Sequence, residues 1–297
     1  MLWDGLVIPI PTLFAGDGTL DVDLNVRFAV ELARAGADRL FVLGSLGEFP
    51  SVSDDERARL VRAVVDGLAG RVDVWVGCGA PSTRQAVAFA QGAEGAGAAA
   101  LLAVPPYYLH PTPAAIDRYY RAIHAATHLP LLAYNIPSLV GYRIAPEFVQ
   151  NLVRGGVVVG VKDTSGSIES VEQFLRNAPA GMRVLPGDDR LASAAIGRGA
   201  SGAIMGLANI LPKLCVDLVA AAHAGNRPLT CELQGLVDGL ADVVAAGPFP
   251  ATGKFLAHRL RGAEVGYRAP YDPLNPEEEA AVLARLAPCE ERFAPYR

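Results

Sequence analysis

Eight short runs rich in Val, Leu and Ile recur along the chain, and each is followed by a longer segment whose apolar residues have helical spacing. Most of these runs are apolar on both faces, which is typical of strands buried between a barrel interior and an outer layer of helices. The pattern therefore predicts eight strands, at residues 6–14, 39–45, 72–79, 99–106, 129–137, 157–163, 183–189 and 201–209.

Eight β/α units in one chain predict a TIM (β/α)8 barrel. The alternative is an open, doubly wound parallel sheet, but no GxGxxG motif follows the first predicted strand. The helix between the second and third strands has a clear start signal. In "SDDERARLV", Ser53 is placed as an N-cap and Glu56 as its capping-box partner.

After about residue 210 the predicted strands stop and helical patterns follow. The first of these helices completes the barrel, so we expect the barrel that carries the active site to cover residues 1–225. The remaining helices predict a C-terminal helical region, residues 226–297, packed on the barrel. The helical segments are residues 211–225, 229–247, 250–262 and 275–288.

The composition narrows the class of protein further. A chain of 297 residues, 51% of them hydrophobic, can bury a large core. Its net charge of −5 argues against a nucleic-acid partner, because phosphate binding needs clustered Lys and Arg. The four cysteines show no CxxC or zinc-like spacing, which fits reduced thiols. The five histidines form no HExxH or HxH pattern, which argues against a metal-dependent enzyme.

Two apolar segments have the composition of possible targeting or membrane elements. The N-terminal "MLWDGLVIPIPT" has no basic region before its short apolar run, so no signal peptide is expected. The stretch "GAGAAALLAVPP" is too short to cross a membrane and ends in two prolines. The expectation is a cytoplasmic protein with no membrane partner.

Lys162 ends an apolar run in "VVVGVKDTSG", at the end of the strand where a TIM barrel carries its active site. One interpretation is a strand-terminal lysine whose side chain extends to water. The other is a nucleophile that forms a Schiff base with a keto group. An amine attacks such a group only when unprotonated, and enzymes use burial to lower lysine pKa values from about 10.4 to roughly 7–8.

Hydroxyl groups gather at the same predicted strand ends. Tyr134, on the strand beside that of Lys162, is either a core aromatic or a proton shuttle. Tyr107 and Tyr108 are either interface aromatics or members of a relay toward Tyr134. Ser45 follows a strand in "GSLGE", where the glycines either form a tight turn or leave backbone N–H groups available to a carboxylate.

Three carboxylates stand near these strand ends. Asp163 is expected to point away from Lys162, because strand neighbours alternate faces, and to cap the following helix. Asp188 and Asp189, in "GDD", could form a metal pair. No third ligand stands at a recognisable spacing, so a helix cap is the favoured interpretation of this pair.

Taken together, the strand-end motifs resemble the dihydrodipicolinate synthase / N-acetylneuraminate lyase family of pyruvate-dependent class I aldolases. They appear in the family's order and spacing, and the resemblance covers essentially the whole chain. The matching motifs are "GSLGE" (44–48), "PPYY" (105–108), "YNIP" (134–137), "GVKDTSG" (160–166), "GDD" (187–189) and "GASGAIMG" (199–206).

The resemblance implies roles for individual residues. Lys162 would form the Schiff base with pyruvate or another 2-keto acid, and Tyr134 would shuttle protons. Ser45 would hold the substrate carboxylate or join the relay. Tyr108 is similar to a tyrosine that family members insert across a dimer interface, in a homotetramer built as a dimer of dimers. The backbone carbonyl of Ile204 would face the bound pyruvate.

Other positions bear on the substrate. Leu46 stands where many relatives have a second hydroxyl residue, although its backbone N–H could still bind substrate. Asp188 is a further candidate substrate-binding residue. Thr164 resembles the sugar-acid branch of the family, in which a threonine there contacts substrate hydroxyls. The serine of that branch on the last strand is not matched, because Gly206 stands near its place.

One departure concerns the lysine-pathway synthases. They have an arginine, two residues beyond the proline of "YNxP", that receives the carboxylate of aspartate semialdehyde. This chain has Leu139 there, and Arg143 is the nearest basic residue in sequence. An uncharged polyhydroxy aldehyde is therefore the expected partner of the keto acid.

The favoured hypothesis is a lyase that cleaves or condenses a 2-keto-3-deoxy sugar acid, or a similar hydroxy-keto acid, to or from pyruvate and an aldehyde. The alternatives are a dehydratase using the same Schiff base and 4-hydroxy-tetrahydrodipicolinate synthase. A non-catalytic relative that binds a keto acid is the alternative outside enzymes. No cofactor or metal is expected, because the lysine imine itself serves as the electron sink.

Overall fold

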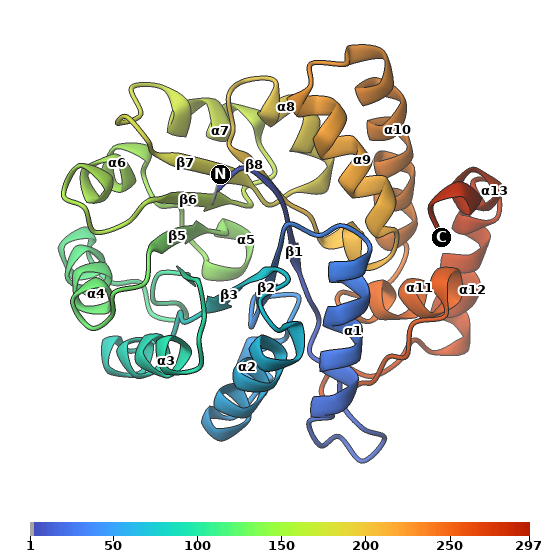
Figure 1. The fold of residues 1–297 in the computed structure, drawn as a ribbon, viewed down its shortest axis with the longest axis horizontal. Coiled ribbons are helices and arrows are strands. Elements are labelled where there is room, and N and C mark those ends of the chain that lie inside the picture. The colour runs from blue at the N-terminus through green and yellow to red at the C-terminus, as the bar shows by residue number, and fades with distance from the viewer. Residues whose placement is uncertain (1–2) are drawn as a thin grey trace.

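The computed structural model describes residues 3–297 as a ring of parallel strands inside a layer of helices (Figure 1). The hydrogen-bonded order is β7-β6-β5-β4-β3-β2-β1-β8. A hydrogen bond of 2.9 Å from the Ser201 N–H to the Val184 carbonyl brings β7 and β8 together, so the barrel is nearly closed. The strands are β1 (Gly5–Pro9), β2 (Arg39–Val42), β3 (Asp73–Gly77), β4 (Ala100–Ala103), β5 (Leu131–Asn135), β6 (Gly160–Asp163), β7 (Arg183–Pro186) and β8 (Gly202–Ile204). Seven of them lie within the predicted runs, β1 begins one residue before its run, and the TIM-barrel prediction is confirmed.

Most of the barrel helices begin at a side chain that accepts a hydrogen bond from the first turn. Ser53 accepts from Glu56 N–H, and the Glu56 carboxylate accepts from Ser53 N–H, so the predicted capping box is present. The helices that follow the first seven strands are α1 (Val22–Arg34), α2 (Asp54–Leu68), α3 (Thr83–Gly95), α4 (Pro113–Ala125), α5 (Pro137–Val140), α6 (Pro146–Arg154), α7 (Ile168–Leu175) and α8 (Ala192–Ile196).

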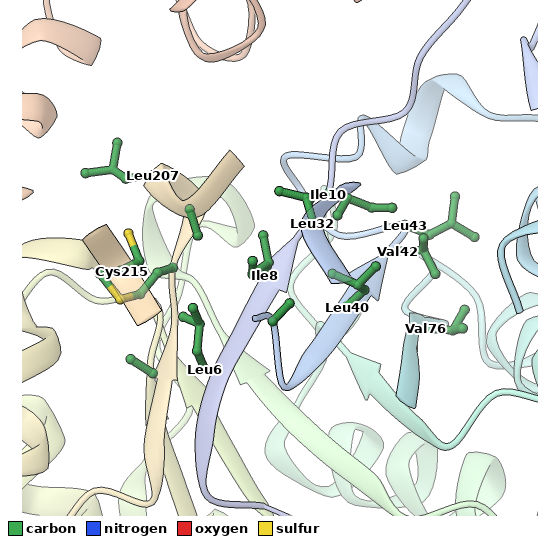
Figure 2. Packing of buried hydrophobic residues seen from close by; sticks show 14 of the residues in the cluster. Leu6, Ile8, Ile10, Leu32, Leu40, Val42, Leu43, Val76, Leu207 and Cys215 are labelled. Atoms are coloured by element: carbon green, nitrogen blue, oxygen red, sulfur yellow. The ribbon is translucent and has the colours of Figure 1, made fainter. Parts of the chain in front are cut away.

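Alternation along the strands divides the core into two parts. On β1, Leu6 and Ile8 face the helices, where Figure 2 shows them beside Leu40 and Val42 of β2. The residue between them, Val7, faces the barrel interior. The interior is a separate buried cluster with large side chains, which fill the barrel below the C-terminal ends of its strands. Its members are Val7, Phe41, Trp75, Ala100, Leu102, Leu132, Leu185 and Ile204.

Beyond β8 the described chain is helical. α9 (Pro212–His223) packs against β1, and α10 (Arg227–Val244) packs along α9 (Figure 1). α11 (Ala251–Arg261) contacts the 3-10 turn Gly206–Asn209 that follows β8, which brings it to the mouth of the barrel. α12 (Pro276–Leu286) completes the set of four predicted from the sequence, and α13 (Glu290–Phe293) was not predicted. None of the helices between residues 3 and 297 has the length and hydropathy of a membrane-spanning segment.

Candidate active site

Lys162 and Tyr134 lie side by side at the C-terminal end of the barrel. The β5–β6 register pairs them directly, and both side chains are 4% exposed. The Lys162 Nζ lies 4.2 Å from the centroid of the Tyr134 ring and 5.2 Å from the centroid of Phe41, which closes the site from below. The sequence left open whether Lys162 reaches water, and the structure places its ammonium group inside, against two aromatic rings.

The next pair in the same register faces the other side of the sheet. Asn135 Nδ2 donates a 2.6 Å hydrogen bond to Asp163 Oδ1, and Ser165 Oγ donates to the other carboxylate oxygen at 2.9 Å. Asp163 therefore points away from Lys162 as predicted. The prediction that it caps α7 is wrong, because Ser167 is the N-cap and the carboxylate is instead held by its strand neighbours.

The environment of Tyr134 suits proton transfer. Burial alone raises the pKa of its phenol, but the nearby Lys162 charge and hydrogen bonding with Ser45, Lys162 and Thr164 oppose this. The net effect holds the Tyr134 pKa below its usual value. Thr164 Oγ1 is close enough to contribute to that shift, yet it is buried without a well-formed hydrogen bond. An orphaned buried hydroxyl at a reactive site is a group that a substrate can satisfy.

Gly187, the first residue of "GDD", leaves the space that Lys162 occupies. A Cβ built on Gly187 would come within 2.6 Å of Lys162 Cε and would overlap Thr164 Oγ1. The backbone of Gly187 lies outside the left-handed region, so conformation does not require a glycine here. The requirement is space for the two side chains that β6 presents to the site.

The loop after β2 carries one hydroxyl into the site. Ser45 borders a small space beside Tyr134, together with Phe41 and Val104. Leu46 points elsewhere, since its Cδ2 lies 3.9 Å from the position that a Cβ on Gly206 would take. Leu46 also lines a separate pocket of 340 Å³ near α10. Many relatives have a second hydroxyl residue at the position of Leu46. In this chain the Leu46 side chain points away from Tyr134, so it makes no contact there in place of that hydroxyl.

A buried ion pair supports this loop from the C-terminal helices. Lys254 of α11 contacts Glu48 at 2.6 Å, with the two side chains 2% and 1% exposed. The Glu48 oxygens accept no well-aligned hydrogen bond from the described residues, whereas Lys254 Nζ also donates to Gly266 O at 2.8 Å. Burial raises the pKa of Glu48 and lowers that of Lys254, while the partner's charge opposes each change. Glu48 N–H bonds Ser45 O, so the pair is coupled to the loop that holds Ser45.

A second contact from the C-terminal region reaches the same part of the chain. Arg268 makes two hydrogen bonds to the Glu56 carboxylate, at the first turn of α2, and another to Ser51 O at 2.8 Å. These hydrogen bonds from Arg268 lower the pKa of Glu56 to about 2. The start of α2 and the loop before it are thus fixed by residues near the end of the chain.

The two tyrosines of "PPYY" lie in different environments. Tyr107 is half-buried and packs edge-on against Phe49, with ring centroids 5.9 Å apart. Tyr108 is 90% exposed, with a positive φ of 74°, so it does not reach Tyr134 of its own chain. Its predicted place across a dimer interface stays a prediction.

Asp188 and Ile204, the predicted substrate-binding residues, lie just after β7 and at the end of β8, and their roles toward a substrate stay predictions. Asp188 accepts a hydrogen bond from Arg190 N–H and caps a 3-10 turn, which confirms the cap interpretation. Asp189 accepts from Gly206 and Leu207 N–H groups, at 3.2 and 3.0 Å, and ties β7 to β8. Ile204 is buried in the barrel interior. Within residues 3–297, no three His, Cys, Asp or Glu side chains are grouped as a metal site.

A pocket of 360 Å³ opens at the barrel mouth, and three of its wall residues, Val104, Ile136 and Val140, pack in one cluster with Tyr134. It shares Ser45, Phe49 and Val104 with the small space beside Tyr134. Leu139 is 60% exposed at its rim, and Arg143 is exposed and does not line it. The lining residues are Ser45, Glu48, Phe49, Pro50, Val104, Tyr107, Ile136, Leu139, Val140, Phe249, Pro250 and Tyr271.

Sequence reasoning missed several of these residues. Phe41 lies within a predicted strand and Gly187 within the "GDD" motif. Neither residue type nor spacing in the sequence indicates that these two residues contact Lys162. Glu48 and Lys254 are ordinary charged residues in sequence, and a lysine between apolar helix positions in "GKFLAHRL" is the one available hint of burial. Phe249 and Tyr271 reach the pocket from segments that the sequence places outside the barrel.

Comparisons with known proteins agree with this architecture. The sequence model of the Dihydrodipicolinate synthetase family matches residues 3–288. A DapA-like lyase of Halobacterium salinarum is 36% identical over 284 residues, which are 95% of this chain and 93% of that protein. A 4-hydroxy-tetrahydrodipicolinate synthase of Aromatoleum aromaticum is 34% identical over 283 residues, 95% of this chain and 97% of that protein. A solved structure with the same fold is that of YagE, a prophage protein of the dihydrodipicolinic acid synthase family from E. coli K12, in complex with pyruvate. It superposes on this chain with a TM-score of 0.92 at 27% identity, over 98% of this chain and 99% of that one.

Proposed function

The chain belongs to the Dihydrodipicolinate synthetase family, and on that basis we propose that it is a Schiff-base lyase of a hydroxy-keto acid. Its reaction cleaves or condenses such an acid, of the 2-keto-3-deoxy sugar acid type, to or from pyruvate and an aldehyde. The observation that carries the proposal is the buried contact between Lys162 and Tyr134, a nucleophile beside a proton carrier. The pyruvate complex of YagE supports the choice of keto acid.

In the cleavage direction, Lys162 Nζ attacks the C2 keto carbon of the substrate. Loss of water from the carbinolamine gives an iminium. Tyr134 accepts the proton of the C4 hydroxyl, the C3–C4 bond breaks, and its electron pair moves toward the iminium nitrogen. The aldehyde leaves, the enamine is protonated at C3, and water hydrolyses the imine to release pyruvate.

The surrounding residues have supporting roles in this scheme. Ser45 borders the same small space as Tyr134, where the keto-acid carboxylate would bind, with the backbone N–H of Leu46 as a second donor. Thr164 Oγ1 is available to a substrate hydroxyl. The iminium withdraws electrons as a metal ion would, so no metal or cofactor is part of the proposal.

Two alternatives use the same lysine. A dehydratase would remove a hydroxyl as water after the iminium has acidified the neighbouring C–H bond. A 4-hydroxy-tetrahydrodipicolinate synthase is the activity named for the Aromatoleum relative. Against it stands Leu139 at the rim of the mouth pocket, because no Lys or Arg of residues 3–297 is among the residues that line this pocket.

The assembly belongs to the proposal as well. Tyr108 and Leu109 are 90% and 75% exposed on the loop after β4. Large apolar side chains that are exposed next to each other are typical of an interface. We expect a homotetramer in which this loop contacts a second copy of the chain.

The lysine content makes a decisive test possible, because the chain contains Lys162, Lys213 and Lys254 and no other lysine. Incubation with pyruvate and borohydride, followed by peptide mass mapping, should place the reduced adduct on Lys162. Lys213 is an exposed internal control, and Lys254 is a buried one. An adduct on either control, or none on Lys162, would exclude the proposed mechanism.

A further inference from the structure

The mouth pocket is apolar to a degree that a sugar-like substrate does not explain. Eight of its twelve lining residues have side chains that can form no hydrogen bond. They are Phe49, Pro50, Val104, Ile136, Leu139, Val140, Phe249 and Pro250. The charged residue among them is Glu48, whose carboxylate is already in contact with Lys254. The side-chain hydroxyls available are those of Ser45, Tyr107 and Tyr271.

The pocket lies next to the reacting centre and shares wall residues with it. Tyr134 belongs to the same buried apolar cluster as Val104, Ile136 and Val140, all three of which line the pocket. Ser45 borders both the pocket and the space beside Tyr134. An aldehyde whose oxygen faces Tyr134 and Ser45 therefore directs its substituent into this apolar space.

The size of the pocket limits what that substituent can be. A cavity of about 150 Å³ lined by apolar side chains holds a benzene molecule. The mouth pocket, at 360 Å³, has room for one aromatic ring with short substituents. Phe49 and Tyr107 already pack edge-on at its wall, and Phe249 lies at its rim.

We propose that the aldehyde partner of this enzyme carries an apolar, preferably aromatic, substituent that binds in the mouth pocket. The inference rests on the Schiff-base reaction of the proposed function and replaces its sugar-type aldehyde with an aryl aldehyde. In the condensation direction, C3 of the pyruvate enamine forms a bond to the aldehyde carbon, and the aldehyde oxygen takes a proton from Tyr134. Water then hydrolyses the imine, which gives a 4-hydroxy-2-keto acid with an aryl group on C4.

The physical reason is the difference in desolvation between the two kinds of aldehyde. Each sugar hydroxyl that enters this pocket exchanges water for a wall with few partners, and an unsatisfied polar group is disfavoured there. An aryl group gains from the same transfer, in proportion to its buried apolar area. This favours the aryl aldehyde over a polyhydroxy aldehyde, contrary to the expectation from sequence, and we expect a preference in kcat/KM of about tenfold or more.

The experiment compares benzaldehyde with glyceraldehyde, two uncharged aldehydes, in condensation with pyruvate by the intact enzyme. Their intrinsic reactivities differ, so the informative quantity is the change in the ratio of kcat/KM values on mutation. Leu139→Ser places a hydroxyl at the exposed rim and should lower the benzaldehyde-to-glyceraldehyde ratio about five- to tenfold. Leu229→Ser, at an exposed leucine of α10 outside the pocket, should leave the ratio unchanged. Phe249→Ala is a second pocket variant on a different segment and should act in the same direction.

The outcomes separate this inference from the function on which it rests. An imine on Lys162 together with faster use of glyceraldehyde, or a ratio unaffected by both pocket variants, would overturn the inference alone. If a second copy of the chain occupies the pocket, the aryl substituent cannot bind there. The enzyme would then use glyceraldehyde faster, which would also overturn the inference. No imine on Lys162 would overturn the proposed function, and the inference with it.

Discussion

Lys162 and Tyr134 are direct partners in the β5–β6 register, with Nζ 4.2 Å from the tyrosine ring centroid, whereas the next pair, Asn135 and Asp163, hydrogen-bonds on the opposite face. One register thus fixes two kinds of contact, one reactive and one structural. A slip of one residue would exchange the two pairs and place a carboxylate where the lysine stands. The Asn135–Asp163 hydrogen bond, at 2.6 Å and buried, helps to hold this alignment.

Tyr134→Phe should keep the fold and lose about 10²–10⁴-fold in kcat, because its hydroxyl moves protons in several steps of the reaction. The phenylalanine ring can still pack against Val104 and Ile136. Tyr120→Phe is the matched control, since its buried hydroxyl bonds Ala103 O and lies near the backbone of Tyr134, which takes no part in proton transfer. Steady-state kinetics with thermal melts should show a loss of rate in the first variant and a loss of stability of about 1 kcal/mol in the second. A Tyr134→Phe enzyme with normal rates would reduce Tyr134 to a packing residue.

Gly187→Ala should damage the site, because the added methyl overlaps Lys162 Cε and Thr164 Oγ1. Lys162 must then shift from its position beside Tyr134, so we expect pyruvate imine formation to slow by at least about tenfold, as is usual when a reacting group is misplaced. Gly235→Ala serves as a control, because nothing lies within 4 Å of the added methyl in α10. That change should stabilise the helix by about 0.5–1 kcal/mol. Equal rates of borohydride trapping in both variants would contradict the role given to Gly187.

Lys254→Met should lower the free energy of unfolding by about 3–5 kcal/mol, because it leaves Glu48 buried without its countercharge. Replacing both partners, in Glu48→Gln with Lys254→Met, should restore part of that loss, since no uncompensated charge then remains. Urea unfolding of the single and double variants measures both effects. A double variant that is less stable than the single one would contradict the view that the uncompensated Glu48 charge causes the loss.

Leu139→Arg should raise kcat/KM for aspartate semialdehyde by about one to two powers of ten. A guanidinium at this exposed rim position can bind the second carboxylate with charge-assisted hydrogen bonds, worth roughly 1.5–3 kcal/mol. Leu139→Gln supplies hydrogen-bond donors without the charge and should gain much less. If the unmodified enzyme already prefers the semialdehyde to uncharged aldehydes by tenfold, then the chain is a synthase and the proposed substrate class is wrong.

Treatment with EDTA should leave turnover unchanged, because the iminium on Lys162 supplies the electron sink for which other aldolases use a metal ion. Activity is measured before and after dialysis against the chelator, and again after addition of Mg²⁺, Mn²⁺ or Zn²⁺. Loss of activity on dialysis, with recovery on adding one of these ions, would show that the proposed mechanism lacks a component.

Local patterns were sufficient for much of the fold. Runs apolar on both faces located all eight strands, and the Ser53–Glu56 spacing located the start of α2, because both depend on neighbours in sequence. Alternation along β6 correctly oriented Asp163 relative to Lys162. Alternation did not predict that Asn135 would be the hydrogen-bond partner of the Asp163 carboxylate. The N-cap of α7, predicted to be Asp163, is Ser167.

The remaining contacts join segments that no local pattern connects. Leu46 turns toward Gly206 because the loops after β2 and β8 meet at the barrel mouth. Gly187 is required because a larger residue would overlap the side chains of Lys162 and Thr164. The backbone conformation of Gly187 does not itself require a glycine. The apolar wall of the mouth pocket combines residues from the segments after β2, β4 and β5 with Phe249 and Tyr271, so its character becomes visible only when the chain has folded.

The contacts of Lys254 and Arg268 with the β2–α2 segment have a consequence for biosynthesis. Arg268 and Glu56 lie 212 positions apart, so the loop that carries Ser45 emerges from the ribosome long before its supports are made. Early β/α units can begin to form during translation. The Glu48 carboxylate, however, has no countercharge from Lys254 until α11 has been synthesised and has packed against the barrel. The loop that carries Ser45 is therefore completed late in folding. A nascent chain stalled before residue 254 would contain Lys162 and Tyr134 and still lack a finished active site.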